Sequence, residues 1–241
     1  MSEQAQLPSF EELRRTRNPY PDHTPEADRI FWTLNGPLHS SVWIQSHGSL
    51  KPYAQGTDEL NPNWHPISQC PLTEPKVSSI TVTVDELDIW EAEWVSYHQR
   101  HADPPDPQLD EPYVCEGYRY GPLLDYDPDL DGESRLHLLE CCGMLRPRGV
   151  VSSIVVKPSP GNEFVTIHDY LTTVHAFLLA SRDDILAAMS ACEPEILPAE
   201  TKLMVNHNML DCLMILLEEE NSAEWWNCFR RTRPSNLVDD D

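Results

Sequence analysis

Several histidines in this sequence have neighbours that could bind a metal ion. His98 and His101 lie three residues apart, and His101-Ala102-Asp103 has the His-x-Asp order of non-haem iron sites with two histidines and one carboxylate. Such a site needs a further, distant histidine. The candidates are His137, His168, His175 and His207. The sequence lacks the many-stranded pattern of the barrel that normally carries this site, so it does not favour iron chemistry.

An acidic segment is similar to a calcium-binding loop. Asp127, Asp129 and Asp131 stand at positions 1, 3 and 5, and Gly132 stands at position 6, as an EF-hand loop requires. Position 12 is Leu138, where such a loop has a glutamate. The sequence therefore favours an acidic surface turn. Weak binding of a divalent cation by the three aspartates stays a hypothesis, and no other cofactor is predicted.

The seven cysteines do not follow the pattern of a disulfide framework or a structural zinc site. Their number is odd, no C-x-x-C occurs, and the only close pair is Cys141-Cys142. Either of these could be a nucleophile with a distant histidine, but scattered cysteines more often fill a core. The sequence also lacks the G-x-S-x-G, P-loop and G-x-G-x-x-G motifs. We therefore assign no catalytic residue.

Residues near the C-terminus are the best candidates for binding a partner. Trp225 and Trp226 are adjacent, and adjacent residues on a helix point about 100° apart, so one indole is expected to leave the core. Arg230 and Arg231 follow, and Trp and Arg are enriched among the residues that dominate protein interfaces. These four residues predict a protein-binding surface. A helix that docks both indoles in the core is the alternative.

The charge of the chain excludes some classes of partner. Its 241 residues contain 40 acids and 17 bases, a net charge of -23, and residues 85–140 hold 16 of the acids with three arginines. Binding to nucleic acids or to anionic membranes depends on Lys and Arg, so neither is expected. No apolar stretch is long enough to span a bilayer, and the N-terminus has no secretory signal. We expect a cytoplasmic or nuclear protein.

The middle of the chain predicts strands and one amphipathic helix. Residues 77–84 are rich in β-branched side chains, and Leu87, Trp90 and Trp94 then follow at helical spacing, which predicts a strand and a helix over 85–101. A short strand is expected over 113–118. The segment 135–142 is either a strand or a helix.

The second half predicts a hairpin followed by helices. Residues 150–157 and 163–167 are expected to form its strands, with a Pro/Gly turn between them. Thr166 with Asp169 is similar to a capping box for a helix that begins at 167. Ser181 with Asp184 predicts a second box and a helix over 185–192. Further helices are expected over 199–217 and after Ser222.

These elements give an α+β fold with a mainly antiparallel sheet packed against several helices. Residues 1–76, with ten of the 22 prolines, are expected to form an arm packed on the main domain at 77–233. The arm starts with a capping box at Ser9 and Glu12 and contains two short apolar runs, 30–34 and 42–45, that could pair as a hairpin. Residues 234–241 form an acidic tail.

One segment resembles a known family. The order of short strand, Pro/Gly turn, Phe164-Val165-Thr166-Ile167-His168-Asp169-Tyr170-Leu171 and two helices over 150–192 is similar to a family of fungal proteins classed only as a domain of unknown function. His168 before Asp169 and Tyr170 after it depart from that family's usual pattern. The resemblance implies an α+β domain of fungal origin. It implies no catalytic residues.

The sequence as a whole favours an intracellular acidic protein-interaction or scaffold module without an assembled catalytic motif. The first alternative is an enzyme or metal-dependent protein that uses a pocket of His, Asp and Cys residues. The second is an acidic protein that mimics a nucleic acid and occupies a nucleic-acid-binding protein. Salt distinguishes these, because a complex of the mimic should weaken steeply with ionic strength and a Trp-anchored complex should not.

Overall fold

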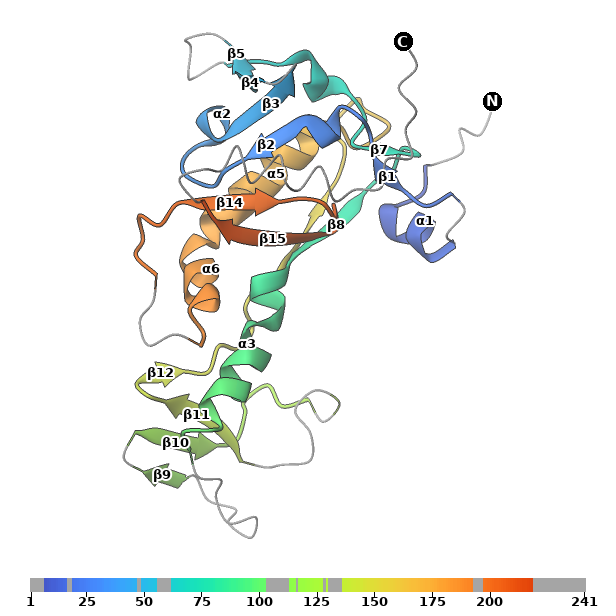
Figure 1. Ribbon diagram of the computed structural model, residues 1–241. Helices are drawn as coiled ribbons and strands as arrows, with labels where there is room; N and C mark the ends of the chain where they lie inside the picture. Colours follow the sequence, from blue (N-terminus) through green and yellow to red (C-terminus); the bar gives the residue numbers. More distant parts are fainter. Residues whose placement is uncertain are drawn as a thin grey trace.

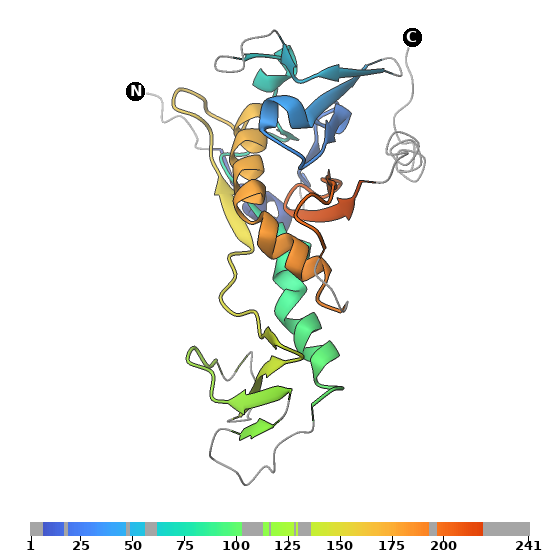
Figure 2. The same cartoon turned by 90° about the vertical axis from the view of Figure 1, so that its left-hand side faces the viewer.

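The fold is α+β, as predicted, with mostly antiparallel sheets packed against helices (Figure 1). A computed structural model describes residues 7–16, 19–46, 49–55, 62–102, 113–115, 117–127, 129, 136–192 and 197–218. Most of them form an upper body. One long helix runs down from this body to a separate small sheet (Figures 1 and 2).

The central sheet of the upper body has the order β13 (Ser153–Val156), β8 (Ile80–Val84), β15 (Cys212–Leu217) and β14 (Leu203–Asn206). The β8–β15 pair is parallel, and the other pairs are antiparallel. Val82 and its alternate neighbours on β8 are buried, as expected for a strand with one face on the core. The strand predicted over 163–167 is wrong, because β13 pairs with β8 and Thr166 makes only an isolated bridge to Pro71.

The helix predicted over 199–217 is also wrong, since this segment is the β14–β15 hairpin. The leucines at 203, 210, 213 and 217 have helical spacing by coincidence. Leu213 and Ile215 are buried and the residues between and after them are more exposed, which is the period of a strand. Asn206 ends β14 and its side-chain oxygen accepts the backbone N–H of Asn208 in the following turn, where asparagine is favoured.

Two helices of the second half follow the sequence more closely. Helix α5 (Ile167–Ala180) begins with the predicted capping box, in which Thr166 and Asp169 each accept a hydrogen bond from the other's backbone N–H. Helix α6 (Arg182–Met189) follows directly, but the Ser181 side chain makes no cap bond, so the second predicted box is wrong. The buried face of α5 packs near β13 and supplies Leu171, Val174 and Leu178 to the core.

The first 76 residues contribute to the same core. The predicted helix is α1 (Phe10–Thr16), with reciprocal Ser9 and Glu12 bonds, and the predicted hairpin is β2 (Ile30–Trp32) with β3 (Val42–Ser46). Strand β4 (Ser49–Pro52) extends this sheet, and an isolated bridge from Thr33 to Met204 links it to β14. The remaining short elements are β1 (Asp22–His23), α2 (Leu38–Ser41), β5 (Ala54–Gln55), β6 (Asn63–Trp64) and β7 (Thr73–Glu74), with 3-10 turns at Ala27–Arg29 and Pro66–Gln69.

Helix α3 (Asp85–His98) connects the upper body to the small sheet, and it ends three residues before the predicted boundary. The small sheet is an antiparallel meander of β9 (Tyr113–Cys115), β10 (Tyr118–Gly121), β11 (His137–Cys141) and β12 (Met144–Leu145). It lies at the far end of α3 (Figure 2). We call this end of α3 and the meander the distal unit.

Among the residues that the structure describes, six form a separate buried core in the distal unit. These are Trp94, Ala102, Tyr120, Leu136, Leu138 and Cys141. The core of the upper body has 31 buried residues. Within the described ranges, no helix is long and apolar enough to cross a membrane.

Candidate metal centre

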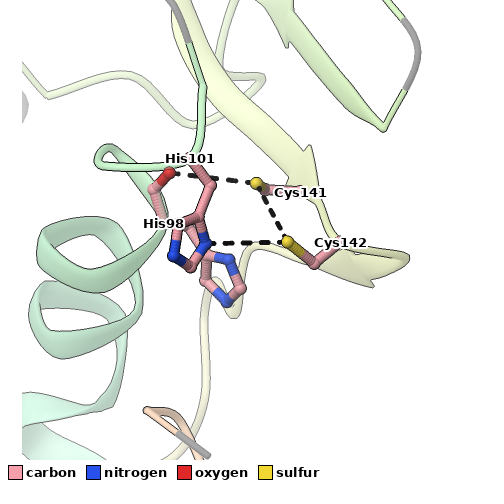
Figure 3. Close-up of side chains that lie close together, drawn as sticks. All are labelled: His98, His101, Cys141 and Cys142. Carbon is pink, nitrogen blue, oxygen red and sulfur yellow. Dashed lines mark hydrogen bonds between the residues drawn. The ribbon is translucent and has the colours of Figure 1, made fainter. Parts of the chain in front are cut away.

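Four side chains with strong metal-binding atoms meet where α3 ends against the distal sheet. These are His98, His101, Cys141 and Cys142, and their ligand atoms all lie within 4.8 Å of one another (Figure 3). In the part of the chain that the structure describes, no other group of three or more His, Cys, Asp or Glu residues gathers in this way. The distal unit therefore holds the best candidate site of the described chain.

The end of α3 positions the two histidines. Residues three apart on a helix share a face, and His98 is the last residue of α3 while His101 closes the following turn through a bond from its backbone N–H to the carbonyl of His98. Trp94, one turn before His98, stacks its ring 4.5 Å from the His98 ring. His98 is thus fixed on the inner side of the helix end.

A tight turn positions the two cysteines. Adjacent residues in a strand point to opposite faces, so Cys141 and Cys142 would normally diverge. Here β11 ends at Cys141, and Cys142 has a φ of 54°, followed by Gly143 at 78°. Positive φ at both central residues is typical of the type I′ turn that closes two-residue hairpins. The turn brings the Cys142 sulfur back beside the Cys141 sulfur and the histidines (Figure 3).

Two of the distances between the ligand atoms match a tetrahedral site. For zinc, with Zn–S of about 2.3 Å and Zn–N of about 2.05 Å, the edges of a tetrahedron are about 3.8 Å between two sulfurs and about 3.6 Å between sulfur and nitrogen. The sulfurs of Cys141 and Cys142 are 3.7 Å apart, and Cys142 Sγ lies 3.6 Å from His101 Nδ1. Two edges of the cluster thus already have the lengths that a bound zinc ion would impose.

His98 lacks hydrogen-bond partners although it is fully buried. Neither Nδ1 nor Nε2 has a partner among the described residues. A buried polar atom without a partner costs about 1–3 kcal/mol, so such an atom at a cluster of ligands calls for an explanation. Burial, and secondarily the neighbouring His101, lower the pKa of His98. The imidazole is therefore neutral near pH 7, which is the form that binds metals.

Burial also affects Cys141, which is 1% exposed. Burial, followed by the contact with Cys142, raises the pKa of Cys141 to about 11, so without a metal this thiol keeps its proton. A metal ligand must be the thiolate, so metal binding would release this proton. Two thiolates and two neutral imidazoles around a divalent cation have a total charge of zero. This is the charge that a half-buried site tolerates best.

Ion pairs hold the distal sheet against α3. Glu91, in the middle of α3, accepts hydrogen bonds from Arg146 Nε at 2.5 Å and from Arg148 Nη1 at 2.9 Å. Arg148 also pairs with Asp125. Because Arg146 follows the β11–β12 hairpin, these bonds fix the hairpin relative to the helix. They therefore support the alignment of the cysteines with the histidines.

The other candidate histidines lie elsewhere, so the structure does not assemble the iron site considered from sequence. His168 faces Tyr53, His175 accepts a hydrogen bond from Trp32, and His207 lies near His23, all in the upper body. His137 lies in the distal sheet beside the Tyr126 ring. None of the four belongs to the cluster. Asp103 lies outside the described residues.

The remaining predicted site residues are described only in part. Asp127 and Asp129 are exposed, and an Asp127 carboxylate oxygen accepts the backbone N–H of Asp129 at 2.9 Å. Asp131 lies outside the described residues. The predicted partner-binding residues Trp225, Trp226, Arg230 and Arg231 also lie outside them.

Sequence reasoning missed the cluster because it expected zinc ligands in C-x-x-C pairs. Two local signals were present: a His-x-x-His pair at the end of an amphipathic helix, and Cys-Cys-Gly at a strand end. Their meeting depends on contacts across about 40 residues of chain, which spacing alone does not show. Comparisons with protein-family models, with curated proteins and with solved structures gave no match.

Proposed function

We propose that this chain is a zinc-binding protein in which His98, His101, Cys141 and Cys142 hold one ion in the distal unit. The observation that carries the proposal is the gathering of four ligand atoms within 4.8 Å of one another, with two distances of tetrahedral length and a buried imidazole that has no partner among the described residues. Two sulfur and two nitrogen ligands in a tetrahedron favour zinc over magnesium, calcium or manganese, which prefer oxygen. The sequence suggests, as an alternative, a metal-dependent protein with a pocket of His, Asp and Cys residues. The cluster contains the His and Cys residues of that alternative but no Asp.

The proposed ion has a structural role. Four protein ligands complete the coordination sphere of a tetrahedral zinc ion, whereas catalytic zinc keeps one coordination position open for water or substrate. The described part of the distal core has six buried residues, and small units commonly depend on a metal. We therefore retain a non-enzymatic interaction or scaffold role as the wider function, with the distal unit as a metal-stabilised head that bears part of the acidic surface.

The test is a titration of metal-free protein with cobalt(II), which absorbs visible light strongly in tetrahedral sites and in the near ultraviolet when thiolates bind it. We expect one equivalent to saturate both signals and one equivalent of zinc to displace it. The matched variants are Cys142→Ser, which removes a ligand, and Cys192→Ser, which removes another exposed cysteine. The first should reduce the thiolate signal by about half or weaken binding at least tenfold, and the second should match the wild type. Identical titrations of both variants would disprove the proposal.

The wider role makes a separate prediction for partners. If the distal unit contacts a protein partner, the complex with zinc-loaded protein should be lost with the Cys142→Ser variant and retained with Cys192→Ser. Dependence on salt then separates charge-driven from apolar contacts, because ionic strength weakens only the former. A partner that binds all three proteins equally would place the interaction outside the distal unit.

A further inference from the structure

We infer that the two cysteines of the zinc site form a redox switch, in which peroxide converts Cys141 and Cys142 into a disulfide and releases the ion. This inference rests on the proposed zinc binding and adds how that site is regulated. It is carried by the proximity of the sulfurs, by their unequal exposure and by their place in a turn. Each of these is independent of the metal.

The sulfurs are close enough to react with each other. They lie 3.7 Å apart, and a disulfide needs about 2.05 Å, so a closure of under 2 Å joins them. Among the other cysteines whose side chains the structure describes, Cys70 and Cys212 belong to the upper body, and Cys192 follows α6 and lines a hollow with Tyr97 and Arg100. An oxidised Cys142 would therefore meet Cys141 first.

The unequal exposure of the pair assigns a role to each cysteine. Cys142 is exposed and Cys141 is almost fully buried, so a small oxidant in solvent reaches the Cys142 sulfur first. Cys141, protected from direct attack, is then the resolving residue. A buried resolving thiol beside an exposed one is the arrangement of reversible redox sensors.

The reaction balances with hydrogen peroxide as the oxidant. The Cys142 thiolate attacks one peroxide oxygen, the O–O bond breaks, and the released hydroxide takes a proton to become water, leaving a sulfenic acid on Cys142. The Cys141 thiolate then attacks the Cys142 sulfur, the S–O bond breaks, and hydroxide leaves as a second water. Two electrons pass from the sulfurs to the peroxide. The zinc ion loses both thiolates and keeps only two imidazoles, which bind it weakly.

The turn makes this disulfide reversible. Neighbouring Cα atoms are about 3.8 Å apart, below the range of about 4.4–6.8 Å in ordinary disulfides, so the bond between adjacent residues is strained and easily reduced. The distortion falls on the peptide between Cys141 and Cys142 at the start of the turn, where Cys142 already has a positive φ. Labile disulfides of this kind are regulatory rather than structural.

The experiment treats zinc-loaded full-length protein with a few equivalents of hydrogen peroxide. Released zinc is read with a coloured chelator, free thiols are counted, and the peptide containing Cys141 and Cys142 is mapped by mass. We expect one zinc ion released for each two thiols lost, a peptide lighter by two hydrogens, and full recovery of zinc binding after a dithiol reductant. Sulfinic or sulfonic acid on Cys142, or a disulfide to another cysteine, would overturn the inference.

A ligand-preserving variant separates the switch from the site. Cys142→His keeps a fourth ligand at a position with positive φ, which His tolerates better than most residues, but it cannot form the disulfide. It should bind zinc and keep it when peroxide is added at the dose that empties the wild type, and Cys192→Ser should release zinc as the wild type does. Release from Cys142→His at the wild-type rate would contradict the switch. Absence of zinc binding in the wild type would instead disprove the proposed function.

Discussion

The upper body and the distal unit are stabilised by different means. The upper body buries Trp32, Tyr170 and a large set of aliphatic side chains between two sheets and α5, and 31 of its residues are buried. The distal unit packs four short strands against one end of α3 with six buried residues, of which one is a cysteine and none is Ile, Val or Phe. The first region is stabilised by apolar burial, and the second needs another contribution.

The two regions also differ in the hydrogen bonding of their buried histidines. In the upper body, His175 accepts a hydrogen bond from Trp32 and donates one to the carbonyl of Gly36. In the distal unit, His98 and the indole nitrogen of Trp94 are buried without partners among the described residues. Glu86 Oε2 in the upper body is also buried without a partner among the described residues, so an unpartnered atom alone does not identify a metal site. The His98 imidazole differs because three other metal-binding side chains lie beside it, and on our proposal an ion completes this group.

Removal of the metal should have the largest effect, and it should be confined to one region. Structural zinc contributes on the order of 10 kcal/mol in small domains, a large share of the stability of a unit of this size. We expect a strong chelator to abolish the protection of backbone amides in β10 and β11 while those in β8 and α5 keep theirs. Hydrogen exchange with mass spectrometry measures both regions in one experiment. Equal loss of amide protection in both regions would contradict the proposal that zinc stabilises only the distal unit.

A deletion in the large core should give the converse result. Leu171 on α5 is fully buried, and Leu171→Ala should lower the free energy of unfolding of the upper body by about 2–5 kcal/mol. The affinity for cobalt should stay within about threefold of the wild type, because the cluster lies at the other end of α3. Denaturant unfolding and cobalt titration measure the two quantities.

The control for that variant is Leu138→Ala, which removes a buried leucine from the distal core. It should reduce metal affinity by more than tenfold and leave the main unfolding transition unchanged. If both alanine variants weakened metal binding to the same extent, the two cores would behave as one cooperative unit.

Local features of the fold could be read from the sequence, and contacts between distant segments could not. Helix α3 follows from Leu87, Trp90 and Trp94, and the cap of α5 follows from Thr166 and Asp169. The segment of the β14–β15 hairpin predicts a helix because Leu203, Leu210, Leu213 and Leu217 have helical spacing. Pairing of β15 with β8, more than 100 residues earlier in the chain, makes this segment a strand instead of a helix. No local sequence pattern indicates that pairing.

The same limit applies to the site. The sequence identifies the pair of His98 and His101 as possible metal ligands. It suggests Asp103 as their partner only because Asp103 is close to them in the chain. The neighbours of this histidine pair in space are Cys141 and Cys142, which meet it only because a tight turn reverses the direction of the second side chain. A backbone conformation with positive φ at a cysteine is not visible in the sequence.

A smaller effect should appear in the pH dependence of the upper body. Glu86, in the first turn of α3, accepts the backbone N–H of Ile215 with one oxygen, and burial raises its pKa to about 7. Since this folded-state pKa exceeds the unfolded value, stability is highest below about pH 4.5 for this group and falls as pH rises through about 7. We expect Glu86→Gln to be more stable than the wild type by about 1 kcal/mol at pH 8, after allowance for partial exposure, and equal to it at pH 5.

Thermal unfolding of both proteins across this pH range, with zinc affinity as the second readout, measures the effect. The difference should affect the main transition and not the affinity, because Glu86 lies at the end of α3 away from the cluster. A constant difference between the proteins at all pH values would show that Glu86 does not titrate in this range.

The smallest predicted effect concerns the ion pairs between α3 and the distal sheet. Glu91 binds Arg146 and Arg148 on the side of α3 that faces the distal sheet, and it is about one-third exposed. Glu91→Gln keeps the size and one acceptor but removes the charge, so it should cost about 0.5–1 kcal/mol of cobalt affinity, a factor of about two to five. Glu93→Gln, which changes a neighbouring α3 carboxylate outside the described ion pairs of this network, is the matched control and should leave affinity unchanged. A weaker affinity in Glu91→Gln that disappears at high salt would identify the charge of these pairs, rather than packing, as what aligns the hairpin with His98.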